Sequence, residues 1–440
     1  MTDWIGDTFT SDRGWNHLET LVDVGDRMAG SDGERDAAEA TRDALAAAGA
    51  RDATLEAFDI QGWERGTSSI DDGTESYDDP HETIALPRSP SGDVTGELVD
   101  LGYGLPEDFE TADLDGAIVL ARSDVPEWYD RYLHRREKYY HAVDAGAAAF
   151  LYRNHVEGCL PPTGSVGTED DPVGEIPAVG VSAETGARLA RRADGDDVTV
   201  TVDATLPDAT SQNVHATLGP DTDEQVLLTS HVDAHDIAEG AMDNGAGTAT
   251  VVEIANALAA RESELDTRVH VVCFGAEEVG LVGSNHLAET IDRDSVAAIL
   301  NCDGVVQARD LAAYAHGFDE LEAVVETVAD HLDHPVYVTP ELGPHSDHWP
   351  FVKHGVPGTH VYGKTAGDGR GWGHTHADTL DKLEKRDLRE QAIVLTELAV
   401  ALASDDTTIP HRDTDAIADQ LHEEDLAEGM QITGDWPYDD

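Results

Sequence analysis

The sequence predicts an α/β protein whose main sheet is mostly parallel and covered by helices on both faces. From about residue 225 onward, nearly continuous apolar runs such as QVLLTS, HVVCF and AAILN alternate with amphipathic helical patterns. Strands that are buried on both faces read as such runs, and the helices between them then cover the two faces of the sheet. A second observation is that the pattern of predicted elements changes in residues 84–207, where short strand-like runs dominate. This change predicts a small β-rich domain inserted into the main one.

Residues 1–83 form the N-terminal part of the main domain in this interpretation. They contain two helical patterns, GWNHLETLVDVGDRMAG and DGERDAAEATRDALAAAGA, in which Ala, Leu and Val recur every three or four residues. Gly49 predicts the end of the second helix. The polar, turn-rich run SSIDDGTESYDDPHET then indicates a domain boundary.

The inserted segment, residues 84–207, has strand patterns on either side of one helical run, RYLHRREKYYHAVDAGA. The order DGAIVLAR, then this helix leading into AAAFLYRN, then EIPAVGVSAETGARLARR resembles the protease-associated (PA) domain. That domain is a small β-rich module inserted into several peptidase families. The alternative is an ordinary α/β domain unrelated to it.

Residues 208–405 are regularly α/β and form the main part of the predicted catalytic domain. The predicted elements, in order, are strand QVLLTSHVD, helix GTATVVEIANALAARE, strand RVHVVCFGAEE, a helix from about residue 282, strand AAILNCDG, helix FDELEAVVETVADHL, strand PVYVTP, helix DHWPFVKHG, strand GTHVYG and helix RDLREQAIVLTELAVALAS. In open α/β sheets, functional residues gather at the carboxyl ends of the strands. Residues 406–440 are predicted to form an acidic C-terminal tail.

The charge of the chain excludes several classes of partner. The sequence holds 90 acidic against 28 basic residues, a formal net charge of -62. Such a field repels phosphate backbones and anionic bilayers, so we expect neither nucleic acid nor a membrane as partner. Because apolar strand patterns recur throughout, we predict a folded, halophilic protein, for which molar salt shortens the range of repulsion to about 3 Å. Without a recognisable secretory signal, a cytoplasmic location is expected, and three cysteines without a CxxC spacing predict no disulfide framework.

Residues of the metal-binding type follow several predicted strands. They are His231 and Asp233 after QVLLTS, Asp243 in the loop GAMDNGAG, Glu277 and Glu278 after HVVCFGA, Asp303 after AAILN, and His374 in GHTHADT. Each also has an ordinary explanation, such as a helix cap, a turn or a solvated acidic face. Their joint occurrence at strand ends of one domain favours a metal site, and the mixed nitrogen and oxygen donors suit zinc, or less often cobalt or manganese.

The runs SHVDAHDIAEGAMDNGAG, FGAEEVGLVGS, NCDG, SDHWPFVKHGVPG and GHTHADTLDKL together resemble the zinc aminopeptidases of the M28 peptidase family, nearest to the branch with carboxypeptidase Q. The resemblance implies a zinc-peptidase, phosphorylase/hydrolase-like fold. It also implies two Zn²⁺ ions and the hydrolysis of short peptides as an aminopeptidase or dipeptidase. Homodimers are common among related enzymes, and the sequence leaves the oligomeric state open.

Carried over onto this sequence, the resemblance assigns His231 and Asp303 to one zinc, Glu278 and His374 to the other, and Asp243 as the bridge between them. The family spacing HTxxDT selects His374, with His376 as the competing residue.

Glu277 is then the expected general base, which takes a proton from the attacking water and passes it to the leaving amine. Asp233 is expected to accept from the free imidazole N–H of His231 and so to orient that ligand.

Three further residues, Ser346, Asp347 and His348 of SDHWPF, are predicted to bind substrate or to support the ligands, with a cap for the following helix as the alternative. His235 is interpreted as a turn residue rather than a ligand. Asn244 is expected either to hold the carboxylate of Asp243 or to cap the next helix.

Three alternatives to the dinuclear hydrolase stay open at this point. An M20-type metallopeptidase usually carries its extra domain after the Glu-Glu pair, whereas here the insertion precedes His231. A glutaminyl-cyclase-like zinc acyltransferase also has a DHxPF segment, but the intact Asp243 and the Glu277–Glu278 pair favour two metals. A metal-free binding protein on the same fold should lack at least one ligand, and this sequence lacks none.

Overall fold

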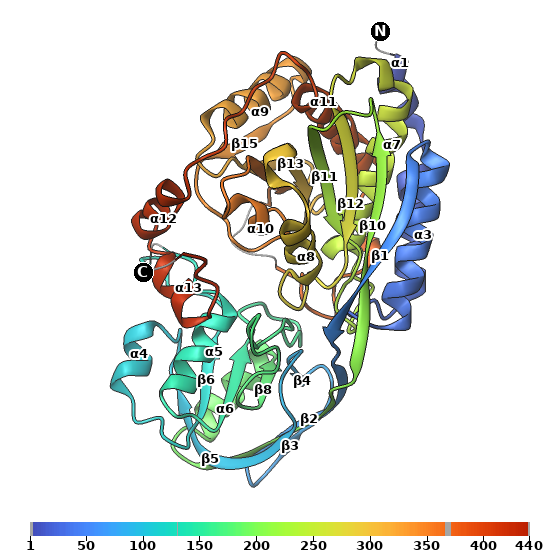
Figure 1. Ribbon diagram of the computed structural model, residues 1–440. Helices are drawn as coiled ribbons and strands as arrows, with labels where there is room; N and C mark the ends of the chain where they lie inside the picture. Colours follow the sequence, from blue (N-terminus) through green and yellow to red (C-terminus); the bar gives the residue numbers. More distant parts are fainter. Residues whose placement is uncertain (1–2, 130, 366–370, 439–440) are drawn as a thin grey trace. The chain divides into compact units, whose positions relative to one another are not determined.

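The computed structural model describes residues 3–129, 131–365 and 371–438, and the chain folds into two compact units (Figure 1). The first unit comprises Met1–Ile60, Thr210–Gly369 and Asp378–Gln420. The second comprises Gln61–Ala209, Arg370–Ala377 and Leu421–Asp440. The domain boundaries at residues 83, 207 and 405 stay predictions from the sequence.

The first unit is built on an eight-stranded sheet of order β1-β10-β12-β11-β13-β16-β14-β15. Its strands are β1 (Arg51–Gln61), β10 (Asp208–Leu218), β11 (Gln225–His231), β12 (Arg268–Phe274), β13 (Val296–Cys302), β14 (Leu311–Tyr314), β15 (Val336–Thr339) and β16 (Gly358–Gly363). β12, β11, β13 and β16 run parallel to one another, while β10 pairs antiparallel with β12 and β14 pairs antiparallel with β16. The predicted fold class is therefore confirmed, with a parallel centre and antiparallel pairings toward both edges.

Helices cover both faces of this sheet, as predicted. The helical segments of the first unit are α1 (Asp3–Thr10), α2 (Arg13–Val24), α3 (Asp32–Ala48), η1 (Ala241–Ala246), α7 (Gly247–Ala260), η2 (Glu262–Glu264), α8 (Val282–Thr290), η3 (Arg293–Ser295), α9 (Asp319–Leu332), α10 (Trp349–Val352), η4 (Leu380–Lys382) and α11 (Lys385–Leu402). α7 and α11 pack against β11 and β13, whereas α8 and α10 contribute Leu287 and Phe351 to a buried cluster with Phe274. Gly49 ends α3 in the left-handed conformation at φ 105°, where glycine carries no steric cost.

The second unit has its own eight-stranded sheet, of order β3-β2-β9-β5-β6-β7-β8-β4. Its strands are β2 (Glu64–Asp71), β3 (Ser76–Tyr77), β4 (Thr83–Ala85), β5 (Gly92–Asp100), β6 (Ile118–Arg122), β7 (Ala149–Arg153), β8 (Ala178–Val181) and β9 (Asp197–Thr205). Its helices are α4 (Pro106–Thr111), α5 (Arg135–Asp144), α6 (Ala183–Arg192) and α13 (Ala427–Ile432). The C-terminal segment expected as an acidic tail is partly helical, since α12 (Thr414–Glu423) and α13 both lie in it, and Ile432 packs on the core of the second unit.

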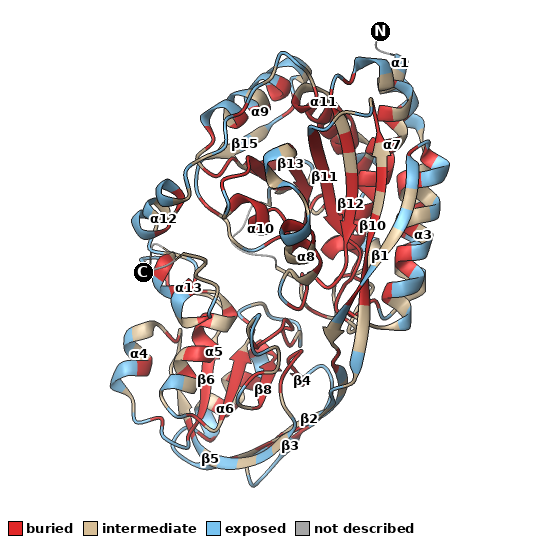
Figure 2. Cartoon of the chain, in the orientation of Figure 1, coloured by how far each residue is buried: buried red, intermediate tan, exposed pale blue. Residues whose placement is uncertain are grey.

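The distribution of buried and exposed residues follows this architecture (Figure 2). All seven residues of β11 are buried, and so is most of the chain on which the predicted ligands lie. The cysteines are free, with Cys159 exposed and Cys273 and Cys302 buried. Among the described helices, none combines the length and the apolar character needed to cross a membrane.

Candidate metal centre

The carboxyl ends of β11 and β13 bring three predicted ligands together. His231 is the last residue of β11, Asp303 directly follows β13, and Asp243 lies in η1 just before α7. His231 Nε2 lies 3.4 Å from Asp243 Oδ1 and 3.6 Å from Asp303 Oδ1. One ligand atom from each of the three lies within 4.8 Å of the other two, and all three residues are buried. Because β11 and β13 are parallel neighbours, their carboxyl ends meet at one edge of the sheet, as the sequence predicted.

Asp233 fixes the turn that carries the two adjacent glutamates. Its Oδ1 accepts the backbone N–H of Glu277 and its Oδ2 accepts that of Glu278, each at 3.1 Å. His231 Nδ1 lies 3.2 Å from the backbone oxygen of Asp233 and 3.4 Å from its Oδ1. The carboxylate thus orients the Glu-Glu turn as well as facing the histidine, a second role that the sequence did not indicate.

Glu277 lies beside the first group of ligands. Its Oε2 is 3.9 Å from Nε2 of the predicted ligand His231, and its side chain is 10% exposed. Both glutamates lie in the turn just past β12, which ends at Phe274.

The charges in this site are strongly coupled. Burial raises the pKa of Glu277 well above its ordinary value, and the negative charges of Glu278 and Asp303 act in the same direction. Burial lowers the pKa of His231, but the charge of Glu277 and the carboxylates of Asp233, Asp243 and Asp303 outweigh it, so the pKa lies well above the ordinary value. Several carboxylates buried around one imidazole leave an excess of negative charge away from water, which a bound cation would neutralise.

Arg27 holds the loop between β11 and η1. The fully buried guanidinium donates to backbone carbonyl oxygens of Leu21, Val232, Glu239 and Gly240, at 2.8 to 3.1 Å. In return, the Arg27 carbonyl accepts the N–H of Ala234. Gly240 has a φ of 57°, and a Cβ there would lie 2.4 Å from the Cβ of Ala234. A side chain at position 240 would therefore clash with Ala234, and the buried Arg27 stabilises the loop through its backbone carbonyl groups.

Asp378 and Asn244 fix the backbone around Asp243. Asp378 accepts the N–H of Met242 at 2.8 Å and of Asp243 at 3.1 Å. Asn244 accepts the N–H of Gly247, the first residue of α7, and donates to the carbonyl of Cys302. Of the two roles expected for Asn244, the structure shows helix capping, and it adds a tie to the end of β13.

Glu34 of α3 supports the Glu-Glu turn from the N-terminal part of the chain. Its carboxylate accepts the Oγ–H of Ser211 at 2.6 Å, the N–H of Gly30 at 2.7 Å and the N–H of Ala276 at 3.0 Å. Burial, followed by the charge of Asp233, raises its pKa to about 8. Sequence reasoning missed Glu34 and Arg27, because nothing in the local pattern links α3 or RMAGSDG to a turn so far along the chain.

Ser346, Asp347 and His348 are all completely buried. Ser346 Oγ donates to Asp303 Oδ2 at 2.6 Å and accepts from Asn301 at 2.8 Å, so it supports the predicted ligand Asp303 and provides no cap for α10. Burial raises the pKa of Asp347 to about 8.

The ring of His348 lies 4.5 Å from that of His316 and 5.2 Å from that of His360. The predicted role of Ser346, Asp347 and His348 in binding substrate stays a prediction from the sequence.

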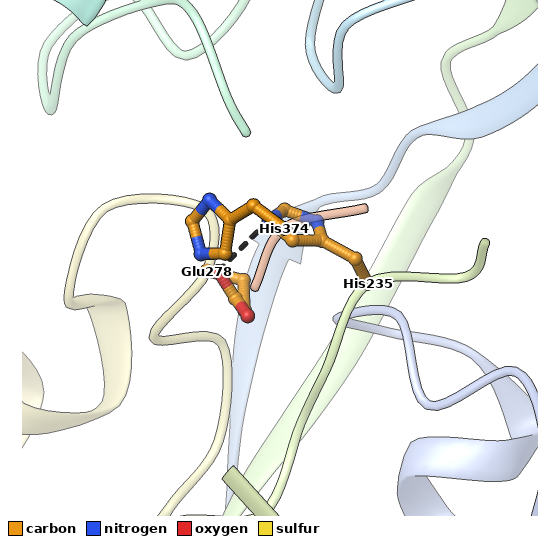
Figure 3. A group of neighbouring side chains, drawn as sticks. All are labelled: His235, Glu278 and His374. Atoms are coloured by element: carbon orange, nitrogen blue, oxygen red, sulfur yellow. Dashed lines mark ion pairs between the residues drawn. The ribbon is translucent and has the colours of Figure 1, made fainter. Parts of the chain in front are cut away.

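Glu278 contacts a histidine that the sequence analysis set aside. His235 Nε2 lies 2.9 Å from Glu278 Oε2, and the two side chains are 5% and 3% exposed (Figure 3). The third side chain drawn there, His374, belongs to the segment Arg370–Ala377 of the second unit, where its carbonyl accepts the N–H of Thr163. His376, the competing residue, interacts with the carbonyl of Pro80 in the same unit. The assignment of His374 as a ligand stays a prediction from the sequence.

The geometry of the site defines a class of protein. A parallel α/β sheet presents imidazole and carboxylate groups at its strand ends, next to a carboxylate that is not required as a ligand. Such a donor set fits zinc, and the extra carboxylate is typical of a metal-dependent hydrolase.

Comparison with known proteins agrees with this class. Residues 213–399 match the model of Peptidase family M28, and residues 94–189 match the model of the PA domain. Both resemblances noted in the sequence are therefore confirmed: one region of the chain matches peptidase family M28 and another matches the PA domain.

Individual relatives are aminopeptidases by name. The aminopeptidase YwaD of Bacillus subtilis (strain 168) is 29% identical over 318 residues, which cover 69% of this chain and 66% of the relative. The probable leucine aminopeptidase 2 of Aspergillus oryzae is 28% identical, with 66% of this chain and 60% of the relative covered. The chain thus spans slightly less than two thirds of these curated relatives.

Solved structures match over more of their length. An aminopeptidase from Aneurinibacillus sp. strain AM-1 is similar with a TM-score of 0.67 and 26% identity, covering 93% of this chain and 97% of that one. BSAP, a zinc aminopeptidase from Bacillus subtilis, is similar with a TM-score of 0.69 and 25% identity, covering 91% and 96%.

Proposed function

We propose that this chain is a dinuclear zinc exopeptidase, an aminopeptidase that removes residues from the amino ends of short peptides. The observation that carries the proposal is the convergence of His231, Asp243 and Asp303 at the strand ends, with Glu277 beside them. The names of the relatives, aminopeptidase and zinc aminopeptidase, support the same activity and favour it over a dipeptidase.

The metal assignment follows the donor groups of the chain. His231 and Asp303 would hold one ion, Glu278 and His374 the other, and Asp243 both. Divalent zinc at such a site lowers the pKa of water and polarises the carbonyl of a peptide bond. The residues around the ligands keep them in place: Ser346 bonds Asp303, and Asp378 bonds the backbone of Asp243.

Glu277 acts as the general base in this proposal. Its Oε2 lies 3.9 Å from Nε2 of the predicted ligand His231, and Glu277 is not itself assigned as a ligand, so its carboxylate is free to act as a base. It takes the proton of the attacking water and delivers it to the leaving amine. Asp233 keeps Glu277 in position through the backbone of the turn.

The working medium is proposed to be concentrated salt, with the cytoplasm of a halophile as the location. A formal net charge of -62 supports this, because self-repulsion between so many carboxylates is relieved only when salt screens them. The proposed substrates are short peptides with a free amino end. Their hydrolysis should be assayed in concentrated KCl.

A matched pair of substrates and one variant test the proposal. Aminoacyl-4-nitroanilides and short peptides should be hydrolysed by the zinc-loaded protein, and the same peptides with an acetylated amino end should not. Glu277→Gln keeps the size of the side chain and removes the base, so turnover should fall by at least about 100-fold while zinc stays bound. Equal cleavage of acetylated peptides, or full activity of Glu277→Gln, would contradict the proposal.

A further inference from the structure

His235 is in direct contact with a residue assigned to the second metal ion. Its Nε2 lies 2.9 Å from Glu278 Oε2 (Figure 3), and both side chains are almost completely buried. An imidazole nitrogen and a carboxylate oxygen are both donor types that zinc takes from proteins.

The backbone on both sides of this contact is held in place. Asp233, two residues before His235, accepts the N–H of Glu278 at 3.1 Å, which ties the loop after β11 to the turn after β12. The N–H of Ala234 donates to the carbonyl of Arg27 at 3.0 Å, and Arg27 donates back to the carbonyl of Val232. A donor pair mounted on such anchored loops is preorganised, as a tight metal site requires.

The charge around the pair points to a cation rather than to an isolated ion pair. The carboxylates of Asp233, Asp243 and Asp378 are buried near the same loop, where Arg27, hydrogen-bonded to backbone carbonyls, supplies only one positive charge. One imidazolium at His235 would offset a single negative charge, whereas a divalent ion shared by His235 and Glu278 offsets two.

We propose that His235 is a ligand of the metal ion held by Glu278, a nitrogen donor in addition to the set assigned by the family resemblance. This inference rests on the proposed dinuclear site. It gives the sequence SHVDAHD two metal-binding histidines, His231 for one ion and His235 for the other.

The test measures metal binding directly, without relying on turnover. His235→Phe removes both ring nitrogens and keeps the volume of a ring, and His235→Gln keeps a polar side chain. His334→Phe is the matched control, because His334 is also buried and its Nε2 lies 3.7 Å from Glu390 Oε1, away from the ligands. Each protein is stripped of metal in concentrated KCl and titrated with Zn²⁺ against a chromophoric chelator, then with Co²⁺ to record visible absorption.

The wild type and His334→Phe should bind two equivalents with the same affinities and the same cobalt spectrum. Both His235 variants should keep one tight equivalent, weaken the other by at least about 10-fold, and change the cobalt absorption of that equivalent alone. Unchanged affinities and an unchanged cobalt spectrum in His235→Gln, which has the better prospect of folding normally, would overturn the inference while leaving the dinuclear site intact. A wild type that binds no metal would instead contradict the proposed function.

Discussion

Asp233 offers the most informative single substitution outside the ligands. Its carboxylate is completely buried and accepts two backbone N–H groups, those of Glu277 and Glu278, each at 3.1 Å. In Asp233→Asn one acceptor oxygen remains, and the amide NH₂ faces the other N–H, so one hydrogen bond is lost and a buried donor is left unpaired. A hydrogen bond to a charged group is worth about 1.5–3 kcal/mol, which corresponds to about 10- to 150-fold in an equilibrium constant.

We therefore expect Asp233→Asn to lower the free energy of unfolding by about 1.5–3 kcal/mol and to weaken zinc binding by about 10- to 100-fold. Urea denaturation and chelator competition, both in concentrated KCl, measure the two effects. Asp72→Asn is the control in the second unit, because Asp72 also accepts two backbone N–H groups, from Thr74 and Glu75, but both reach Oδ1, which asparagine keeps. It should lose less stability than Asp233→Asn and keep the wild-type zinc affinity. Wild-type zinc affinity in Asp233→Asn, or an equal loss of affinity in Asp72→Asn, would refute the reasoning.

Three further outcomes follow from the same structure. Ser346→Ala removes the 2.6 Å hydrogen bond to Asp303 and should weaken zinc binding about 10- to 100-fold, measured by chelator competition; an unchanged affinity contradicts the supporting role. Burial lowers the pKa of His17 in the folded chain to about 4, from the ordinary value of 6.5. As the pH falls from 6.5 to 4, the unfolded chain takes up a proton on this histidine and the folded chain does not, so the free energy of unfolding decreases. His17→Gln should flatten that part of the pH profile of unfolding by up to about 3 kcal/mol, and an identical profile argues against it. In dilute buffer the circular dichroism spectrum should show unfolding, since the charge of -62 is then unscreened; a spectrum equal to that in molar KCl rules out the predicted salt requirement.

The sheet could be predicted, and two of the predicted ligands, His231 and Asp303, could be placed at its strand ends, because the signals for both are local. A strand buried on both faces is a continuous apolar run, and His231 and Asp303 come directly where two such runs stop. The short strand β14 (Leu311–Tyr314) was missed, since four residues carry little periodicity. The antiparallel pairing of β10 and β14 was also not foreseen, because it depends on which strands become neighbours.

The residues that hold the ligands could not be found in the same way. Arg27 and Glu34 reach the loops after β11 and β12 from the N-terminal segment, and only tertiary structure brings them there. Ser346 was expected to bind substrate, support the ligands or cap a helix, and the structure shows that it bonds Asp303. His235 looked like a turn residue because no spacing rule links it to Glu278, and the anchored loop is what brings the two together.

The zinc content of the purified protein tests the central claim most directly. After loading with Zn²⁺ in concentrated KCl and removal of loosely bound ions, elemental analysis should give two zinc equivalents per chain. Asp243→Ala, which removes the carboxylate expected to bridge the ions, should lose both together. A wild type with no zinc, or an Asp243→Ala variant that keeps one tightly bound ion, would contradict a dinuclear site bridged by Asp243.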